Sequence, residues 1–140
     1  FDLLAATTIP DLIRARVPDN HLRLWVAGCG TGEETYSLAM LLLEQMATLG
    51  STLKVQIFAS DIDADAVATA REGLYPAGIA GAVSPQRLAR FFTPEDGGYR
   101  VRPELRARVV FTVRNVLADP PFFRLESRFF SSSRRTLGRR

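Results

Sequence analysis

The spacing of apolar residues divides the chain into alternating strand-like and helix-like segments. Residues 22–27, 53–59 and 109–113 are short apolar runs typical of buried strands. Between the first two runs, residues 33–49 carry a stripe at helical spacing, and Gly50 supplies a stop signal. The stripe consists of Leu38, Leu41, Leu42, Gln45, Met46 and Leu49. This alternation predicts an α/β fold with a short parallel sheet.

Two more helices are predicted in the first half of the chain. Residues 1–20 suit one short helix that is interrupted at Pro10. Residues 63–72 form an alanine-rich helix that ends before Gly73 and turns Val67 inward. Both fit the alternating pattern of strand and helix.

The alternation pauses in the second half of the chain. Residues 73–81 are rich in glycine and are predicted to form a loop. Ser84 and Pro85 provide an N-cap and a first-turn proline for a short helix that continues to about Phe92. A turn at 96–98 then leads into a short exposed strand over residues 99–102.

Composition indicates one globular domain in a reducing, cytoplasmic setting. A chain of 140 residues with 46% hydrophobic and 24% charged residues suits one modest core. No apolar run approaches the roughly 20 residues that a membrane span requires, and no secretory signal opens the sequence. Cys29 is the only cysteine, so no internal disulfide can form. Its place between two glycines favours a packing role over a catalytic one.

The net charge of +3 comes from the end of the chain. Residues 127–140 contain five arginines and no acid, and the rest has 13 basic against 15 acidic residues. The body is therefore mildly acidic and lacks the basic stripe of a nucleic-acid-binding surface.

A glycine-rich turn after the first strand is the strongest candidate for a binding site. Gly28, Gly30 and Gly32 alternate and are followed by Glu33, whereas a dinucleotide-binding turn reads G-x-G-x-x-G. A carboxylate at Glu33 would repel a pyrophosphate but attract the amine and sulfonium of S-adenosylmethionine (SAM). Asp61, at the end of the second strand, suits the hydroxyls of a ribose. The alternative is a turn that only connects a strand to a helix.

A calcium loop is a second interpretation of the acids in this region. Asp61, Asp63, Asp65 and Glu72 occupy positions 1, 3, 5 and 12 of an EF-hand. Position 6 is Ala66 where the loop requires glycine, and the preceding segment is strand-like. The sequence therefore favours helix N-terminal roles for Asp63 and Asp65, and we expect no metal site.

Five segments together resemble the chemoreceptor glutamate methyltransferases of the CheR family, most of all the versions inside large fused sensory proteins. They are WVAGCGTGEETYSLAM from Trp25, FASDID from Phe58, VSPQRLARFF from Val83, GYRVR from Gly98 and NVLADPPF from Asn115. The resemblance covers residues 22–125 in the order of the family. It implies a Rossmann-like class I SAM-dependent methyltransferase fold with three layers.

The resemblance also implies a reaction and a set of binding residues. The reaction is SAM-dependent methyl-ester formation on glutamate side chains of methyl-accepting chemoreceptors or related signalling proteins. By motif, Glu33 lies near the methionine end of the cofactor, Asp61 binds the ribose, and Asn115 and Val116 lie beside the adenine. A glutamate carboxylate is ionised at neutral pH, so no general base and no catalytic residue is expected.

The resemblance gives an expected domain organisation. Residues 1–126 would form a partial SAM-binding domain, with the N-terminal half of the sheet and a small inserted subdomain over residues 73–108. Residues 127–140 would be a basic tail, disordered or read out of frame, because a Cys-Arg-Asn strand is expected there. Such a partial sheet would expose an unpaired edge. The alternative function is an inactive interaction module of a fused sensory protein.

Overall fold

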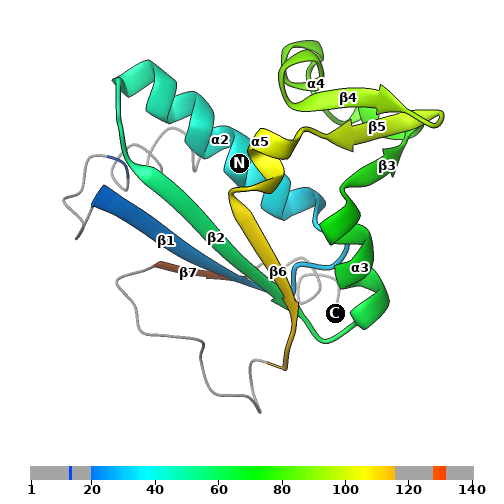
Figure 1. Cartoon of the computed structure of the whole chain (residues 1–140), viewed down its shortest axis with the longest axis horizontal. Coiled ribbons are helices and arrows are strands. Elements are labelled where there is room, and N and C mark those ends of the chain that lie inside the picture. Colours follow the sequence, from blue (N-terminus) through cyan, green and yellow to red (C-terminus); the bar gives the residue numbers. More distant parts are fainter. Residues whose placement is uncertain (1–12, 14–19, 116–127, 132–140) are drawn as a thin grey trace.

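The described residues form two β-sheets (Figure 1). The computed structural model describes residues 13, 20–115 and 128–131. The parallel sheet has the strand order β6-β2-β1-β7, and the antiparallel sheet has the order β3-β5-β4. The strands are β1 (His21–Ala27), β2 (Lys54–Asp61), β3 (Leu74–Pro76), β4 (Phe92–Glu95), β5 (Gly98–Val101), β6 (Val109–Val113) and β7 (Arg128–Ser131). The helices are α2 (Glu33–Leu49), α3 (Ala64–Glu72), the 3-10 helix η3 (Ala77–Gly81), α4 (Pro85–Phe91) and α5 (Pro103–Arg106).

The parallel sheet confirms the three strands expected from the sequence. β1 pairs with β2 from His21 opposite Lys54 to Ala27 opposite Ser60. β6 pairs with the other side of β2, ending at Asp61 opposite Val113. β2 therefore runs two residues beyond its expected end at residue 59, because β6 continues the ladder there. The fold is a Rossmann-like α/β arrangement.

The first two helices after β1 also follow the sequence. α2 starts at Glu33 and ends before Gly50, which has a left-handed φ of 65° and donates its amide to carbonyls of the last turn. α3 starts after Asp63, whose carboxylate accepts hydrogen bonds from the amides of Asp65 and Ala66. Such a cap satisfies amides that have no partner inside the helix.

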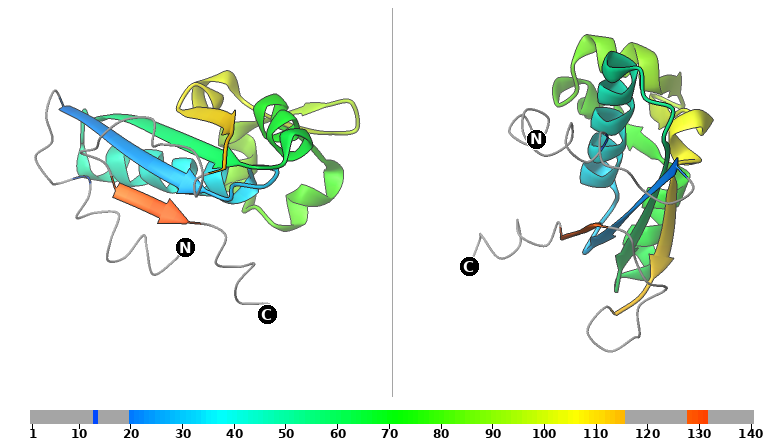
Figure 2. Two further views of the ribbon diagram at one scale, coloured as in Figure 1. Left: turned by 90° about the horizontal axis from the view of Figure 1, so that it is seen from below. Right: turned by 90° about the vertical axis from the view of Figure 1, so that its left-hand side faces the viewer.

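α2 and α3 lie on the same face of the parallel sheet, as Figure 2 shows for α2. The Tyr36 hydroxyl of α2 donates to the carbonyl of Ala70 in α3 at 2.7 Å. The Tyr36 ring also meets the Phe111 ring of β6 edge-on, with 5.4 Å between centroids. Strand residues that point to this face, such as Leu24 and Ile57, are fully buried. The hydrophobic core therefore lies between the sheet and these helices.

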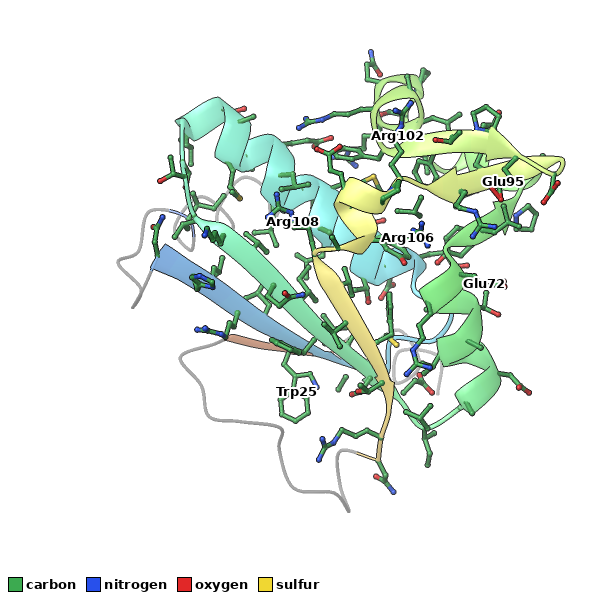
Figure 3. The ribbon with its side chains drawn as sticks, viewed as in Figure 1. Trp25, Glu72, Glu95, Arg102, Arg106 and Arg108 are labelled. Carbon is green, nitrogen blue, oxygen red and sulfur yellow. The ribbon has the colours of Figure 1, made fainter. Side chains whose placement is uncertain are left out.

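The opposite face of the sheet carries a row of large apolar side chains. Trp25, Phe58 and Val110 share one register row across β1, β2 and β6, and Val110 is 42% exposed. Figure 3 labels Trp25 on β1, and its indole donates to the Ser60 hydroxyl at 3.3 Å. Among the described residues, α2 and α3 therefore supply one of the two helical layers that a three-layer fold requires.

The region over residues 73–101 corrects three expectations. Residues 74–76 form β3, where the sequence predicted only a loop. The helix from Pro85 ends at Phe91, and Phe92 begins β4. The strand expected to be exposed is the central strand β5, where Gly98 and Val101 are buried. These strands exist because residues distant in sequence pair with one another, which local composition does not reveal.

The antiparallel sheet, which we call the small sheet, is fixed to its neighbours by arginines. The Arg102 guanidinium donates to the carbonyls of Phe92 and Ala89, each at 3.1 Å, and Figure 3 shows it between α4 and α5. Arg87 of α4 makes a two-bond ion pair with Glu44 of α2, with both distances at 2.8 Å. The small sheet and α2 therefore form one packed unit.

Four residues of the expected tail belong to the main sheet. Arg128–Ser131 form β7, which pairs in parallel with β1 from Leu24 to Ala27. The sequence predicted disorder here, but the free edge of β1 offers backbone groups that a phenylalanine-containing segment can pair with. Over these residues, the edge of β1 is paired with β7, whereas the sequence predicted an unpaired sheet edge. The remaining residues of 127–140 lie outside the described part of the chain.

The helix expected over residues 1–20 is described at one position. Ile13 is helical, 5% exposed and part of the hydrophobic core. Apart from Asn20, the other residues of this segment lie outside the described ranges. The interruption expected at Pro10 therefore stays a prediction.

The packing of β3 against β5 predicts that Gly98 tolerates no side chain. A Cβ added at Gly98 would lie 2.2 Å from the Tyr75 carbonyl oxygen, whereas one at Gly78 would meet nothing within 4 Å. We expect Gly98→Ala to lower the free energy of unfolding by about 1–3 kcal/mol in urea denaturation. Gly78→Ala is the matched control and should change it by less than about 0.5 kcal/mol. Equal values for the two variants would contradict this account of the small sheet.

Candidate functional site

The candidate residues lie at the carboxyl edge of the parallel sheet. The glycine turn follows β1, Asp61 ends β2, and Asn115 comes two residues after β6. Because β1, β2 and β6 are parallel neighbours, these ends lie on one edge, where open α/β sheets place their ligands. The structure thus brings the glycines, Glu33, Asp61 and Asn115 to one edge. Val116 lies outside the described residues.

The glycine turn has a backbone that other residues rarely adopt. Gly28, Gly30 and Gly32 have φ values of 72°, 58° and 96°. A Cβ at Gly32 would lie 2.8 Å from Ala70 Cβ and 3.0 Å from the Tyr75 hydroxyl oxygen. Gly32 therefore permits both the left-handed conformation and the close approach of α3. Packing against α3 and Tyr75 therefore explains the need for glycine at position 32.

Asp61 joins the second strand to the glycine turn. Its Oδ2 accepts a hydrogen bond from the Gly30 amide at 2.8 Å, and its Oδ1 accepts one from the Asp63 amide at 2.9 Å. A carboxylate oxygen has two lone pairs, so each oxygen retains one acceptor site. Asp61 is partly exposed and can therefore accept two further hydrogen bonds, as a pair of adjacent hydroxyls would provide.

Glu33 occupies the first position of α2 and is exposed. The Thr31 hydroxyl donates to its carboxylate. A negative charge in the first turn of a helix is stabilised by the helix dipole. The carboxylate is therefore available to a cation at the edge of the glycine turn.

Ile62 is a further candidate residue at this edge, which the sequence pattern alone did not single out. It follows Asp61 directly and is 69% exposed. A large apolar side chain beside a hydroxyl-binding acid offers a surface for an aromatic ring. The signal was present in the sequence, as an apolar residue between two acids at the end of a strand.

Two buried tyrosines support the turn from the core side. The Tyr75 hydroxyl donates to the Thr31 carbonyl at 2.7 Å, and the Tyr36 hydroxyl donates to that of Ala70. Burial raises the pKa of the Tyr75 phenol, with smaller contributions from Tyr36, Glu33 and Cys29. Burial likewise raises the pKa of Tyr36, and the nearby Arg106 partly opposes this. Both phenols therefore stay protonated and act as donors at neutral pH.

Two of the hollows lined by described residues bear on the position of the site. One of about 90 Å³ lies between α2 and the small sheet, with Glu33, Met40, Tyr75 and Phe92 in its lining. The other, of about 640 Å³, lies at the amino ends of the strands beside His21. The second contains none of the candidate residues, so the site is assigned to the carboxyl edge.

The acids of the calcium alternative have other roles in the structure. Asp61 accepts from two backbone amides, and Asp63 caps α3. Glu72 lies in the last turn of α3, which runs where a calcium loop would need its sharp turn. Within the described ranges, no group of three or more His, Cys, Asp or Glu residues could hold a metal ion. In the same ranges, no helix is long and apolar enough to cross a membrane.

Comparison with known proteins identifies the class to which this site belongs. Residues 1–126 match the family described as "CheR methyltransferase, SAM binding domain". The chain therefore belongs to this family of methyltransferase domains, and SAM is the cofactor of the domain.

Named relatives agree with the family match. A chemotaxis protein methyltransferase of Escherichia coli is 41% identical over 74% of this chain and 37% of its own length. Chemotaxis protein methyltransferase 1 of Pseudomonas aeruginosa is 37% identical over 84% of this chain and 44% of its own length. An uncharacterized 104.1 kDa protein of Rhodobacter capsulatus is 40% identical over 90% of this chain and 13% of its own. The chain thus spans less than half the length of these relatives.

The residues at the sheet edge fit this cofactor. The turn closes only with glycine at position 32, the partly exposed Asp61 carboxylate has two free acceptor sites, and Glu33 provides a negative charge. SAM carries two ribose hydroxyls, a cationic amine and a sulfonium, and it has no phosphate. An anionic edge of this kind suits SAM better than a dinucleotide.

The crowding at Gly32 predicts that this position tolerates only glycine. Gly32→Ala combines an unfavourable φ with a collision against Ala70, so we expect a loss of about 2–4 kcal/mol in the free energy of unfolding. Gly50→Ala also has a positive φ, of 65° against 96° at Gly32, but open space, and should cost only about 1 kcal/mol. Chemical denaturation of both variants measures the difference. An equal loss in the two would show that the contact with α3 is unimportant.

Proposed function

We propose that this chain provides the cofactor site for methyl transfer to glutamate side chains of chemoreceptor-type proteins in chemotaxis signalling. The observation that carries the proposal is the joined edge of β1 and β2, where the Gly30 amide binds the Asp61 carboxylate. The family match supports the cofactor, and the names of the relatives support the signalling context.

Each residue at the edge has a proposed role in binding. Asp61 accepts hydrogen bonds from the ribose hydroxyls, and the exposed Ile62 provides an apolar surface for the adenine. Glu33 attracts the amine and sulfonium. Asn115 and Val116 stay predictions as adenine neighbours, on the motif alone. The glycines allow the backbone to approach the ligand closely.

The reaction needs few groups from the protein. The cofactor supplies a methyl group activated by a positively charged sulfur. A glutamate carboxylate is already ionised at neutral pH and attacks without a general base. The protein then contributes by holding the carboxylate and the cofactor in line, which is catalysis by proximity and orientation.

The names of the relatives support a proposed partner and setting. We propose a methyl-accepting chemoreceptor or related signalling protein as the substrate, acting in the cytoplasm. The match to 13% of a 104.1 kDa relative supports the occurrence of such domains inside larger proteins.

The role of Asp61 is tested by its neutral isostere. Asp61→Asn removes the negative charge. It also replaces one carboxylate oxygen, which accepts a hydrogen bond from a backbone amide, by an NH₂ group that can only donate. We expect the dissociation constant for S-adenosylhomocysteine to rise at least about tenfold, because hydrogen bonds to a charged group contribute about 1.5–3 kcal/mol each. Asp65→Asn is the matched control, because Asp65 is exposed in the first turn of α3.

Isothermal titration calorimetry of the three proteins measures these constants. An unchanged constant in Asp61→Asn would refute the ribose-binding role. Transfer of labelled methyl groups from SAM to a glutamate-containing receptor fragment tests the reaction itself. Cofactor binding without any base-labile methyl ester would favour the interaction module over the enzyme.

A further inference from the structure

The Tyr75 side chain connects the small sheet to the glycine turn. Tyr75 lies in β3, is 4% exposed and donates its hydroxyl to the Thr31 carbonyl at 2.7 Å. Thr31 lies between Gly30 and Gly32, two of the three glycines at which the turn has a positive φ. A residue outside the turn therefore fixes the orientation of the peptide group that joins Thr31 to Gly32.

Two hydrogen bonds of the turn involve the acids of the candidate site. The Gly30 amide binds the Asp61 carboxylate at 2.8 Å, and the Thr31 hydroxyl donates to the Glu33 carboxylate. Both acids are proposed to bind the cofactor. The carbonyl of Thr31 is held by Tyr75 from the buried side, where Gly32 also packs against Ala70. The Tyr75 phenol therefore holds the turn opposite the two acids that are proposed to bind the cofactor.

Tyr75 is itself held firmly in place. Its backbone pairs with Tyr99 of β5, and its ring meets the Tyr36 ring edge-on at 6.2 Å. Gly98 packs directly against its carbonyl. The Arg87–Glu44 ion pair also connects α4, the helix that precedes β4 of the small sheet, to α2. The phenol therefore transmits the position of the small sheet to the glycine turn.

We propose that Tyr75 is a positioning residue of the cofactor site, through which the small sheet sets the affinity for SAM. The proposal rests on the proposed function, because it requires the turn to bind the cofactor. By linkage, a cofactor that binds the held turn more tightly also stabilises the small sheet that holds it.

Tyr75→Phe and Tyr36→Phe form a matched pair of test variants. Each removes one buried hydroxyl that donates to a carbonyl at 2.7 Å, but the acceptor lies in the turn for Tyr75 and in α3 for Tyr36. A merely structural role predicts similar decreases in melting temperature and similar effects on binding. The positioning role predicts similar melting temperatures and different affinities.

We expect Tyr75→Phe to raise the dissociation constant for S-adenosylhomocysteine by about three- to tenfold, the range for one neutral hydrogen bond. Tyr36→Phe should change it by less than about twofold. An equal change in both variants, or none in Tyr75→Phe, would overturn the proposal. So would a Tyr75→Phe chain that melts without cooperativity, because the hydroxyl would then serve folding rather than position.

Hydrogen exchange of the ligand-free chain separates this proposal from the proposed function. We expect faster exchange at the amides of residues 30–34 in Tyr75→Phe and unchanged exchange there in Tyr36→Phe. This readout holds even if the wild-type chain fails to bind S-adenosylhomocysteine, an outcome that would sink the proposed function alone. Unchanged exchange in Tyr75→Phe would show that the phenol does not hold the turn.

Discussion

The hydrogen bond from the Gly30 amide to the Asp61 carboxylate is the interaction on which the rest of the site depends. It joins the turn after β1 to the end of β2 and so converts two strand ends into one binding edge. It forms because β1 and β2 pair in parallel up to Ala27 and Ser60. A shift of register by one residue would move Asp61 away from the turn and reverse the faces of the strand.

The packing behind this bond explains why so much of the structure converges on a short turn. Gly32 lies against Ala70 of α3, Tyr36 of α2 binds the Ala70 carbonyl, and Tyr75 of the small sheet binds Thr31. Three elements therefore meet at the same few backbone atoms. Tyr36, Ala70 and Tyr75 all belong to the hydrophobic core, so the energy that holds the turn comes mainly from that core rather than from the turn itself.

The sequence predicted the local features of this site because their causes are local. The start of α2 at Glu33 and the cap at Asp63 follow from glycine and aspartate at helix boundaries. The joining of the turn and Asp61 follows from parallel neighbours sharing an edge. The sequence did not predict β3 or the role of Tyr75. β3 forms by pairing with β5, and the glycine-rich segment that begins at Gly73 favours a loop when considered alone. β7 depends in the same way on the free edge of β1.

The central claim is that this edge binds SAM, and a thermal melt with and without S-adenosylhomocysteine tests it most directly. At a hundredfold excess over the dissociation constant, a ligand that binds only the folded state stabilises it by about 2.7 kcal/mol. The account predicts a clear upward shift with S-adenosylhomocysteine and none with NAD, whose pyrophosphate would meet Glu33. A cooperative melt that S-adenosylhomocysteine leaves unchanged would contradict it.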